Sequence, residues 1–315
     1  MADKFHPALP DPSIPGSQPP PGVSVAPPPW PLKAKLWTFL YRSASEDPGA
    51  GYRVEENPNN VEDVLQGLPA GAYHPMEVVH PDALKPVDGK PQGSGGMKSV
   101  VIVRYDDTPV GPYDELILIP GAFTNPHTGK RDLRITNIYV STDKSAFNGR
   151  SNWNIGKHIA RFEFSPRPGH ARDEIVKVFH PDDSPLASPL APAPFFTAVL
   201  TNSRIPALPV PFNISPFTIV QPPLLPPRYE EGAMPSIIGT DDSVNGRHNP
   251  WLETPPIYKG RWQLSYISAL PEEEGGLPRH GDGVGYPMIN PISAGAVFTG
   301  HIDFPSSTIV GGGKA

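Results

Sequence analysis

Short apolar segments, separated by links rich in Pro and Gly, predict a chain built mainly of β-strands. The pattern is clearest in the middle of the chain, where Ser99–Tyr105 and Tyr113–Ile119 are joined by a short link and predict a hairpin. Asp132–Ser141 alternates apolar and polar residues and predicts a third strand. Further strands are expected at Leu36–Tyr41, Ile159–Phe164, Glu174–Phe179, Phe195–Leu200, Tyr258–Ile267 and Ala296–Phe304.

Only two stretches are typical of helices. Val61–Gln66 follows Asn59-Asn60, which can cap a helix, and precedes Gly67, which can end one. Thr142–Asn152 opens on Thr142-Asp143, a common helix start. Many short strands and few short helices favour a β-rich α+β fold, in which a large antiparallel or mixed sheet closes into a cone-like barrel.

The distribution of proline suggests where the folded domain begins and ends. Residues 1–31 contain 11 Pro and predict an extended arm, either a disordered tail or an arm that wraps a neighbouring subunit. Residues 32–310 are expected to form one domain, followed by a flexible tail at 311–315. Residues 184–227 hold 12 Pro in 44 positions, but the aromatic residues among them indicate irregular chain packed over the core rather than a linker.

Composition and charge argue against several classes of protein. With 26 basic and 32 acidic residues the chain has a net charge of −6, so no nucleic-acid partner is expected. It has no Cys, which excludes a disulfide scaffold and a thiolate site, and no apolar run long enough to cross a membrane. The first ten residues lack the apolar core of a signal peptide, so a soluble, cytoplasmic protein is expected.

The sequence offers no motif for a metal or an organic cofactor. The ten His form no HExxH pair, and Gly93–Ser99 lacks the Gly-Lys-Ser/Thr ending of a phosphate-binding loop. Trp251 and Trp262 are expected in the core rather than stacked on a cofactor. We therefore expect a protein that needs neither a cofactor nor a metal.

The densest candidate for chemistry is the stretch Ser145–Phe164. Lys157 lies between apolar neighbours, with Arg150 and Arg161 close in sequence. Burial and like charge both disfavour an ammonium group, so this setting predicts a lowered pKa for Lys157. A neutral amine can attack a carbonyl and form a Schiff base. The alternative is an ordinary surface lysine.

The spacing of residues around Lys157 resembles the acetoacetate decarboxylase-like family. In that family a Tyr ends a strand, a Gly-Arg pair follows ten residues later, and the reactive lysine comes eight residues after the Gly. Tyr139, Gly149-Arg150 and Lys157 have this spacing, and Tyr113-Asp114-Glu115 matches the family's upstream Tyr-x-Glu. The resemblance covers residues 97–165 well and extends over 32–305. Within this region, the sequences of Gly111–Leu116 and Ile135–Val140 are most similar to the fungal branch of the family.

This resemblance implies a cofactor-independent lyase whose Lys157 forms an imine with a small carbonyl substrate. As in acetoacetate decarboxylase, a lysine desolvated or placed beside a cation becomes nucleophilic. Glu115 is implied to orient the substrate or shuttle a proton, and Arg150 to hold an anionic group or to form a structural ion pair. The remaining residues expected to contact substrate are His158, Tyr113, Trp153 and Tyr139. The family also implies a homo-oligomer.

Two departures from the family pattern leave the reaction open. His158 stands where the founding decarboxylases place a second lysine. The family's Arg on the first strand has no clear counterpart, because Lys33 and Lys35 flank Ala34 there. Decarboxylation is the simplest reaction, and the substrate is expected to be a keto acid or a polyketide-like carbonyl compound. The alternatives are aldol condensation, dehydration or cyclisation with the same lysine, and a barrel that binds a ligand without catalysis.

Overall fold

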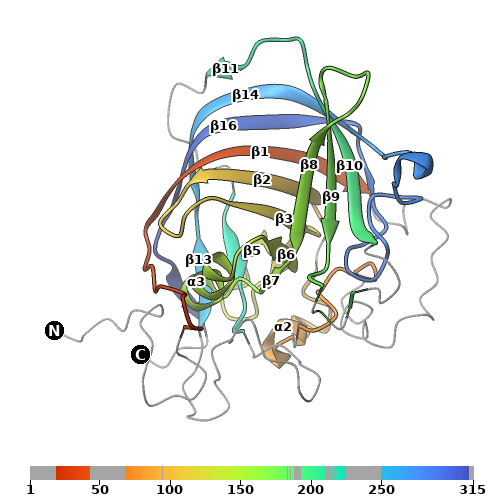
Figure 1. The fold of residues 1–315 in the computed structure, drawn as a ribbon. Coiled ribbons are helices and arrows are strands. Elements are labelled where there is room, and N and C mark those ends of the chain that lie inside the picture. Colours follow the sequence, from red (N-terminus) through yellow and green to blue (C-terminus); the bar gives the residue numbers. More distant parts are fainter. Residues whose placement is uncertain are drawn as a thin grey trace.

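The computed structural model describes residues 19–42, 68–77, 79–93, 95–182, 184, 186–187, 193–209, 215, 217–224 and 250–311. Its main feature is a large mixed sheet that curls until it is nearly closed into a barrel (Figure 1). In spatial order the strands are β7 (Lys157–Ile159), β6 (Asn137–Val140), β3 (Tyr113–Ile119), β2 (Ser99–Asp107), β1 (Trp30–Arg42), β16 (Ala294–Phe304), β14 (Ile257–Ser268), β10 (Pro194–Asn202), β9 (Asp173–Phe179) and β8 (Arg161–Pro166). Two short strands, β11 (Leu208–Pro209) and β15 (Asn290–Pro291), pair with β14 and β1.

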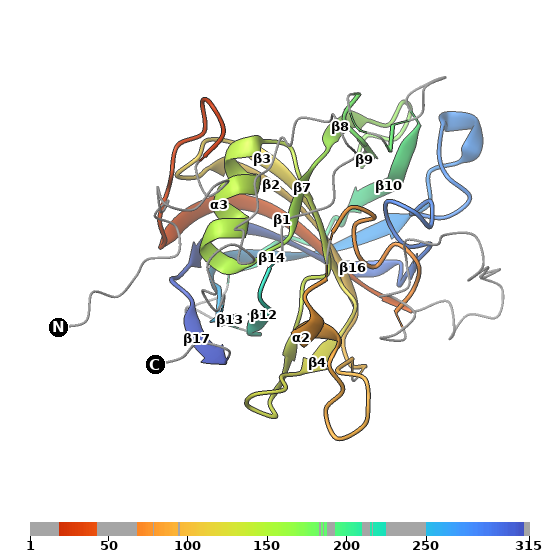
Figure 2. The same cartoon turned by 90° about the horizontal axis from the view of Figure 1, so that it is seen from below.

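A smaller sheet and few helices complete the described fold. The smaller sheet has the order β17 (Thr308–Gly311), β13 (Trp251–Thr254), β12 (Ile219–Gln221), β5 (Arg131–Leu133) and β4 (Ala122–Thr124). The helices are α2 (Pro81–Leu84), α3 (Asp143–Trp153) and the 3₁₀ turn η3 (Glu272–Glu274). Helix α3 contacts β6 and β7, and its place beside the large sheet is visible from below (Figure 2).

The central strands of the large sheet are buried on both faces, which explains their nearly continuous apolar sequences. In β2, Val101 and Val103 point into the curled sheet, whereas Val100 and Ile102 point to the outer face. The outer residues pack in a second apolar cluster with residues of β9 and β10, and β8, β9 and β10 run across this part of the sheet (Figure 1). The inner cluster surrounds the interior of the barrel.

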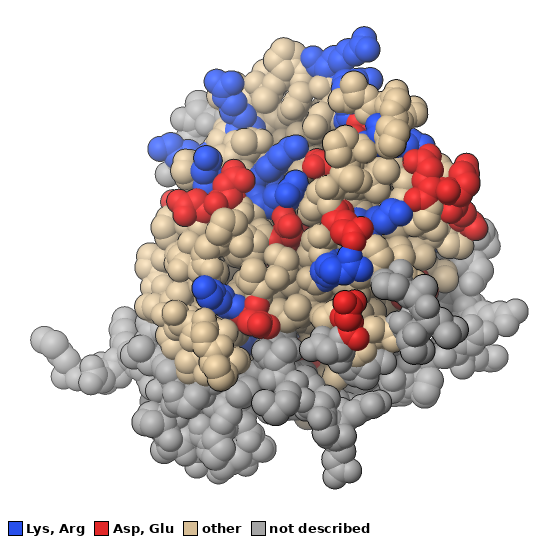
Figure 3. All heavy atoms as spheres, in the orientation of Figure 1, with Lys and Arg blue, Asp and Glu red and all other residues tan. Residues whose placement is uncertain are grey.

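Many charged side chains lie on the outside of this framework. Acidic and basic groups are interspersed over much of the face shown in Figure 3. Arg104 of β2 bonds Asp114 of β3 at 3.1 Å and Glu174 of β9 at 3.4 Å. Exposed pairs of this kind contribute little to stability, on the order of 0–1 kcal/mol each. The fold therefore depends mainly on its two apolar clusters.

The structure confirms the predicted fold class and its best-defined elements. The hairpin forms as expected, with Ser99 opposite Ile119 and Tyr105 opposite Tyr113. The helix predicted at Thr142–Asn152 is α3, and the Thr142 side chain accepts a hydrogen bond from the backbone N–H of Ser145, which caps its first turn.

Two of the predicted strands are wrong because each is divided in two. Asp132–Ser141 becomes β5 and β6, which belong to different sheets. Arg134 lies between β5 and β6 and is buried. Its guanidinium lies over the ring of Phe123 and donates a 2.7 Å hydrogen bond to Gln92, and with these contacts the chain leaves the direction of a continuous strand. Ile159–Phe164 becomes β7 and β8, divided at Ala160. Because β7 and β8 are the two ends of the sheet order, this division lets the sheet curl toward closure.

The chain ends differ slightly from the predicted domain limits. Strand β1 begins at Trp30, two residues before the expected domain start. The described part of the predicted arm packs on its own chain: the backbone of Ser24 and Ala26 bonds the side chain of Asn148 in α3. At the other end Gly311 is the last residue of β17, and 312–315 lie outside the described residues. The helix predicted at Val61–Gln66 also lies outside them.

Candidate active site

The turn that follows helix α3 places Lys157 at the start of β7, next to the helix. The helix ends at Asn154, which adopts the left-handed conformation with φ 53° and donates its backbone N–H to the carbonyl of Arg150. This turn reverses the chain, so that β7 starts at Lys157 and pairs in parallel with β6. The side chain of Lys157 then passes Gly149. A Cβ at Gly149 would lie 2.5 Å from Cδ and 2.6 Å from Cε of Lys157, so only glycine leaves room.

The amine of Lys157 is buried beside a carboxylate. Its Nζ donates to Glu115 Oε2 at 2.8 Å and to Ser145 Oγ at 3.1 Å. Nζ also lies 5.3 Å from the ring centre of Tyr113. Lys157 is 5% exposed and Glu115 3% exposed, so the pair is shielded from bulk water. The structure thus brings together the two residues predicted to be catalytic.

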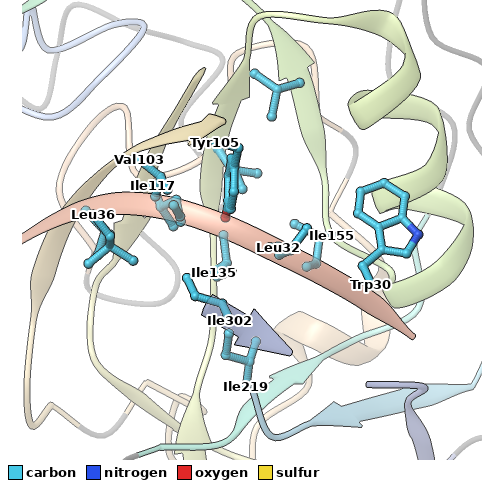
Figure 4. Packing of buried hydrophobic residues seen from close by; sticks show 14 of the residues in the cluster. Trp30, Leu32, Leu36, Val103, Tyr105, Ile117, Ile135, Ile155, Ile219 and Ile302 are labelled. Atoms are coloured by element: carbon cyan, nitrogen blue, oxygen red, sulfur yellow. The ribbon is translucent and has the colours of Figure 1, made fainter. Parts of the chain in front are cut away.

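Both residues line a cavity of about 110 Å³ inside the curled sheet. Its wall is mainly aliphatic and aromatic, and the inward-pointing side chains of Leu36, Ile117 and Tyr105 are seen close to one another in Figure 4. Other lining residues include Trp30, Leu32, Ile135, Ile138, Trp153, Ile155, Ile219 and Ile302. The site is therefore an apolar chamber with one ion pair on its wall.

The expected lowering of the pKa of Lys157 is wrong for this structure. Burial lowers the pKa, but Glu115 and then Tyr113 outweigh it, so the pKa is raised above the ordinary lysine value. Neither predicted cation faces the amine: Arg150 pairs with Glu77, and Arg161 pairs with Glu163. The resting amine is therefore an ammonium group, and Glu115 lies where it can accept the proton that must leave before the amine attacks a carbonyl.

Tyrosine hydroxyls complete the polar lining around the ion pair. The hydroxyl of Tyr105 donates to Glu115 at 3.3 Å. Burial raises the pKa of Tyr113 to about 12, and burial also raises the pKa values of Tyr105 and Tyr258. All three phenols therefore stay protonated near neutral pH. Tyr105 already donates its hydrogen bond to Glu115, whereas Tyr113 and Tyr258 can donate hydrogen bonds to oxygen atoms of a bound molecule.

Arg150 and His158 belong to a second buried polar cluster. Arg150 bonds both carboxylate oxygens of Glu77, at 2.8 and 3.1 Å, and His158 Nε2 contacts Glu77 at 2.7 Å. Burial alone would raise the pKa of Glu77, but Arg150 and His158 lower it to about 2. The ring of His158 stacks on His74 with centroids 3.5 Å apart, and burial lowers its pKa despite Glu77. Both groups hold the Lys157 segment from outside the cavity.

The predicted substrate-contacting residues therefore divide into two groups. Tyr113 and Trp153 line the cavity together with Lys157 and Glu115. Arg150, His158 and Tyr139 are not among its lining residues. Tyr139 lies in the outer apolar cluster, and its hydroxyl donates to the carbonyl oxygen of Gly285. Arg150 has the structural ion-pair role that was the alternative to binding an anionic group.

The first strand presents Ala34, not a lysine, to the interior. Ala34 is 1% exposed and belongs to the inner cluster. Its neighbours Lys33 and Lys35 have the opposite orientation in the strand, and Lys35 lies 3.8 Å from Glu174. The position of the family's first-strand Arg is therefore taken by Ala34, and neither lysine of β1 is among the described residues that line the cavity.

Sequence reasoning missed Tyr105, Tyr258 and Glu77. Tyr105 was within reach, because the predicted hairpin register places it opposite Tyr113. Tyr258 comes from β14, which meets β2 only through the curvature of the sheet. Glu77 lies in a segment without a periodic pattern, 81 positions before His158, so no local signal points to it.

The described residues contain no cluster of three or more His, Cys, Asp or Glu side chains suited to a metal ion. None of the helices in the described ranges has the length and apolar character needed to span a membrane.

Comparisons with known proteins find similar structures but no similar sequence. No protein-family model matches the chain, and no curated protein matches it. An acetoacetate decarboxylase from Legionella pneumophila is 11% identical, with a TM-score of 0.48 over 95% of this chain and 92% of its own. The enduracididine biosynthesis enzyme MppR is 11% identical, with a TM-score of 0.49 over 91% and 89%. An acetoacetate decarboxylase-like enzyme from Sphingomonas wittichii is 13% identical, with a TM-score of 0.45 over 89% and 91%.

Replacing Glu115 by Gln is expected to lower the pKa of Lys157 below the ordinary lysine value. The substitution removes the carboxylate that raises the pKa and leaves burial, which lowers it. Competitive acylation followed across pH by peptide mass mapping measures the shift. The matched change Glu163→Gln, at an exposed carboxylate, is expected to leave the titration of Lys157 unchanged. An unchanged titration in Glu115→Gln would contradict the assignment of Glu115 as the dominant partner.

The same ion pair gives the wild type a defined dependence of stability on pH. The folded-state pKa of Lys157 is higher than its unfolded-state value. Its contribution to stability is therefore complete below the unfolded-state pKa and is lost as the pH rises through the folded-state pKa.

Proposed function

We propose that the protein is a cofactor-independent lyase that forms an imine between Lys157 and a carbonyl substrate. The observation that carries this proposal is the buried contact of 2.8 Å between Lys157 Nζ and Glu115 on the wall of an apolar cavity. A lysine in this position has a carboxylate to accept its proton and a space for a substrate. The resemblance of Tyr139, Gly149 and Lys157 to the acetoacetate decarboxylase-like pattern supports the same chemistry. The assignment to a fungal branch stays a prediction.

The proposed reaction begins with transfer of a proton from Lys157 to Glu115. The neutral amine attacks the substrate carbonyl, a C–N bond forms, and water leaves to give a protonated imine. This cation draws electrons from the adjacent bond. Loss of CO₂ from a β-keto acid is the simplest outcome. Cleavage or dehydration of a β-hydroxy carbonyl compound begins from the same imine, with Glu115 moving the proton at the adjacent carbon.

Trapping with a reductant tests the imine. The full chain is incubated with 2-pentanone and cyanoborohydride, and we expect the mass of the reduced adduct on the peptide that contains Lys157. Lys157→Arg keeps a cation beside Glu115 and is expected to abolish this adduct. The control Lys144→Arg changes an exposed lysine of α3 and is expected to leave it intact. Labelling that persists in Lys157→Arg, or that maps to other lysines only, overturns the proposal.

A further inference from the structure

The charge of the cavity wall limits what the amine can react with. Among the described residues that line the cavity, Lys157 and Glu115 are the charged ones, and they pair with each other. The wall therefore has no net charge. The two arginines near Lys157 in sequence pair elsewhere, Arg150 with Glu77 and Arg161 with Glu163, and Ala34 occupies the inward position on β1.

Imine formation with an uncharged carbonyl compound preserves this balance. The ammonium group and the ketone give a protonated imine and water, and the proton that Glu115 takes from the amine returns when water leaves, so the net charge of the site stays zero. A keto acid adds a carboxylate beside the carboxylate of Glu115. Burying an additional charge in an apolar wall without a partner is costly.

The polar groups that remain in the wall suit an uncharged molecule. Tyr113 and Tyr258 present hydroxyls that stay protonated, and such groups donate hydrogen bonds to carbonyl or hydroxyl oxygens. The exposed residues at the rim are also apolar: Leu40 is 42% exposed and Met97 48% exposed. Both the approach to the cavity and its interior thus favour an apolar compound.

Building on the proposed imine chemistry at Lys157, we infer that the substrate is an uncharged, largely apolar ketone or aldehyde rather than a keto acid. Two reactions can follow the imine, each with Glu115 as the base. In a dehydration, Glu115 removes a proton from the adjacent carbon, the electron pair moves to the imine nitrogen, and the resulting enamine expels the hydroxyl of the next carbon as water. In a retro-aldol cleavage, Glu115 removes the proton of that hydroxyl, a carbonyl forms there, and the bond between the two carbons breaks with its electron pair moving to the imine nitrogen.

Two probes that differ mainly in charge test this inference. Methyl acetoacetate and acetoacetate share a carbon skeleton, but one is an uncharged ester and the other a carboxylate. Each is incubated with the full chain and cyanoborohydride, and the labelling rate at Lys157 is divided by that of free lysine. We expect the normalised rate with the ester to be at least about tenfold higher, because the described lining residues offer the carboxylate no cation besides Lys157, which is paired with Glu115.

A cation introduced into the wall is expected to remove this preference. Thr38 lines the cavity and lies two residues after Leu36 in β1. Leu36 pairs with Val103, and Val103 pairs with Glu115, so this part of β1 lies close to the ion pair. Thr38→Lys is expected to bring the ratio of the two rates close to one. Thr299→Lys makes the same change at an exposed residue that pairs with Lys35, and is expected to keep the wild-type ratio.

The outcomes separate the two proposals. Labelling of Lys157 by acetoacetate as fast as by the ester, or release of CO₂ from acetoacetate with an acetone-derived adduct on Lys157, overturns the inference and leaves the imine proposal standing. The same holds if Thr38→Lys and Thr299→Lys give equal ratios. Absence of labelling by both probes overturns the imine proposal itself, together with the inference that rests on it.

Discussion

Replacing Glu77 by Ala is expected to destabilise the fold by about 3–5 kcal/mol, because it leaves a buried guanidinium without its carboxylate. Arg150 has no exposed side-chain surface and bonds both oxygens of Glu77. His158 loses its partner at the same time. The substitution is also expected to reduce trapping at Lys157, because Arg150 and His158 hold the chain on either side of it.

Urea denaturation measures the loss of stability as a lower midpoint at an unchanged slope. The control Glu163→Ala removes an exposed carboxylate from Arg161 and is expected to leave the midpoint almost unchanged. Should Glu77→Ala fail to fold, Glu77→Gln keeps the side-chain shape and is expected to fold with a lowered midpoint. A midpoint in Glu77→Gln equal to that of the wild type would show that the ion pair contributes nothing.

The wild type provides a second measurement of the same pair. The pKa of Glu77 in the folded state, about 2, is below its ordinary value of 4.5. The stability that it contributes is therefore complete above pH 4.5 and is lost as the pH falls toward 2. Glu77→Gln is expected to lose this part of the acid dependence.

The sequence predicts those parts of the fold that depend on local pattern. The hairpin of β2 and β3 and the capped helix α3 follow from alternation and from Thr142, and both are confirmed. The divisions at Arg134 and Ala160 were not predictable in this way, because they depend on which sheet or which sheet end the chain must reach. Short strands such as β4 and β17 contain too few residues for a pattern to be seen.

The same distinction applies to the site. Lys157 was predicted from its neighbours in sequence and Glu115 from the resemblance to the acetoacetate decarboxylase-like family, and the structure brings them within 2.8 Å of each other. The direction of the pKa shift was wrong because spacing in sequence does not tell which way a side chain points. Arg150, seven residues from Lys157, is turned toward Glu77, whereas Glu115, 42 residues away, faces the amine. Electrostatic predictions need the fold.

Replacing Gly149 by Ala is expected to reduce the rate of imine trapping at Lys157 by about 100-fold or more, while the protein stays folded. Alanine itself favours a helix over glycine by roughly 1 kcal/mol. Its methyl group, however, would lie 2.5 Å from Cδ of Lys157, closer than non-bonded carbons can approach. The lysine must therefore move, and Nζ leaves Glu115 and Ser145. Displacing a reacting group by about 1 Å costs on the order of 100-fold in rate.

Trapping with 2-pentanone, followed by mass mapping, measures this loss beside the urea midpoint of the same variant. Ser151→Ala, at a buried position of the same helix, is the control and is expected to retain trapping. A Gly149→Ala protein that labels Lys157 as fast as the wild type would show that the amine reaches the cavity by another path. A loss of both folding and trapping would point to a packing role for Gly149. Retained folding with lost trapping is the expected result, because the nearest atoms that a Cβ at Gly149 would meet belong to the reactive side chain.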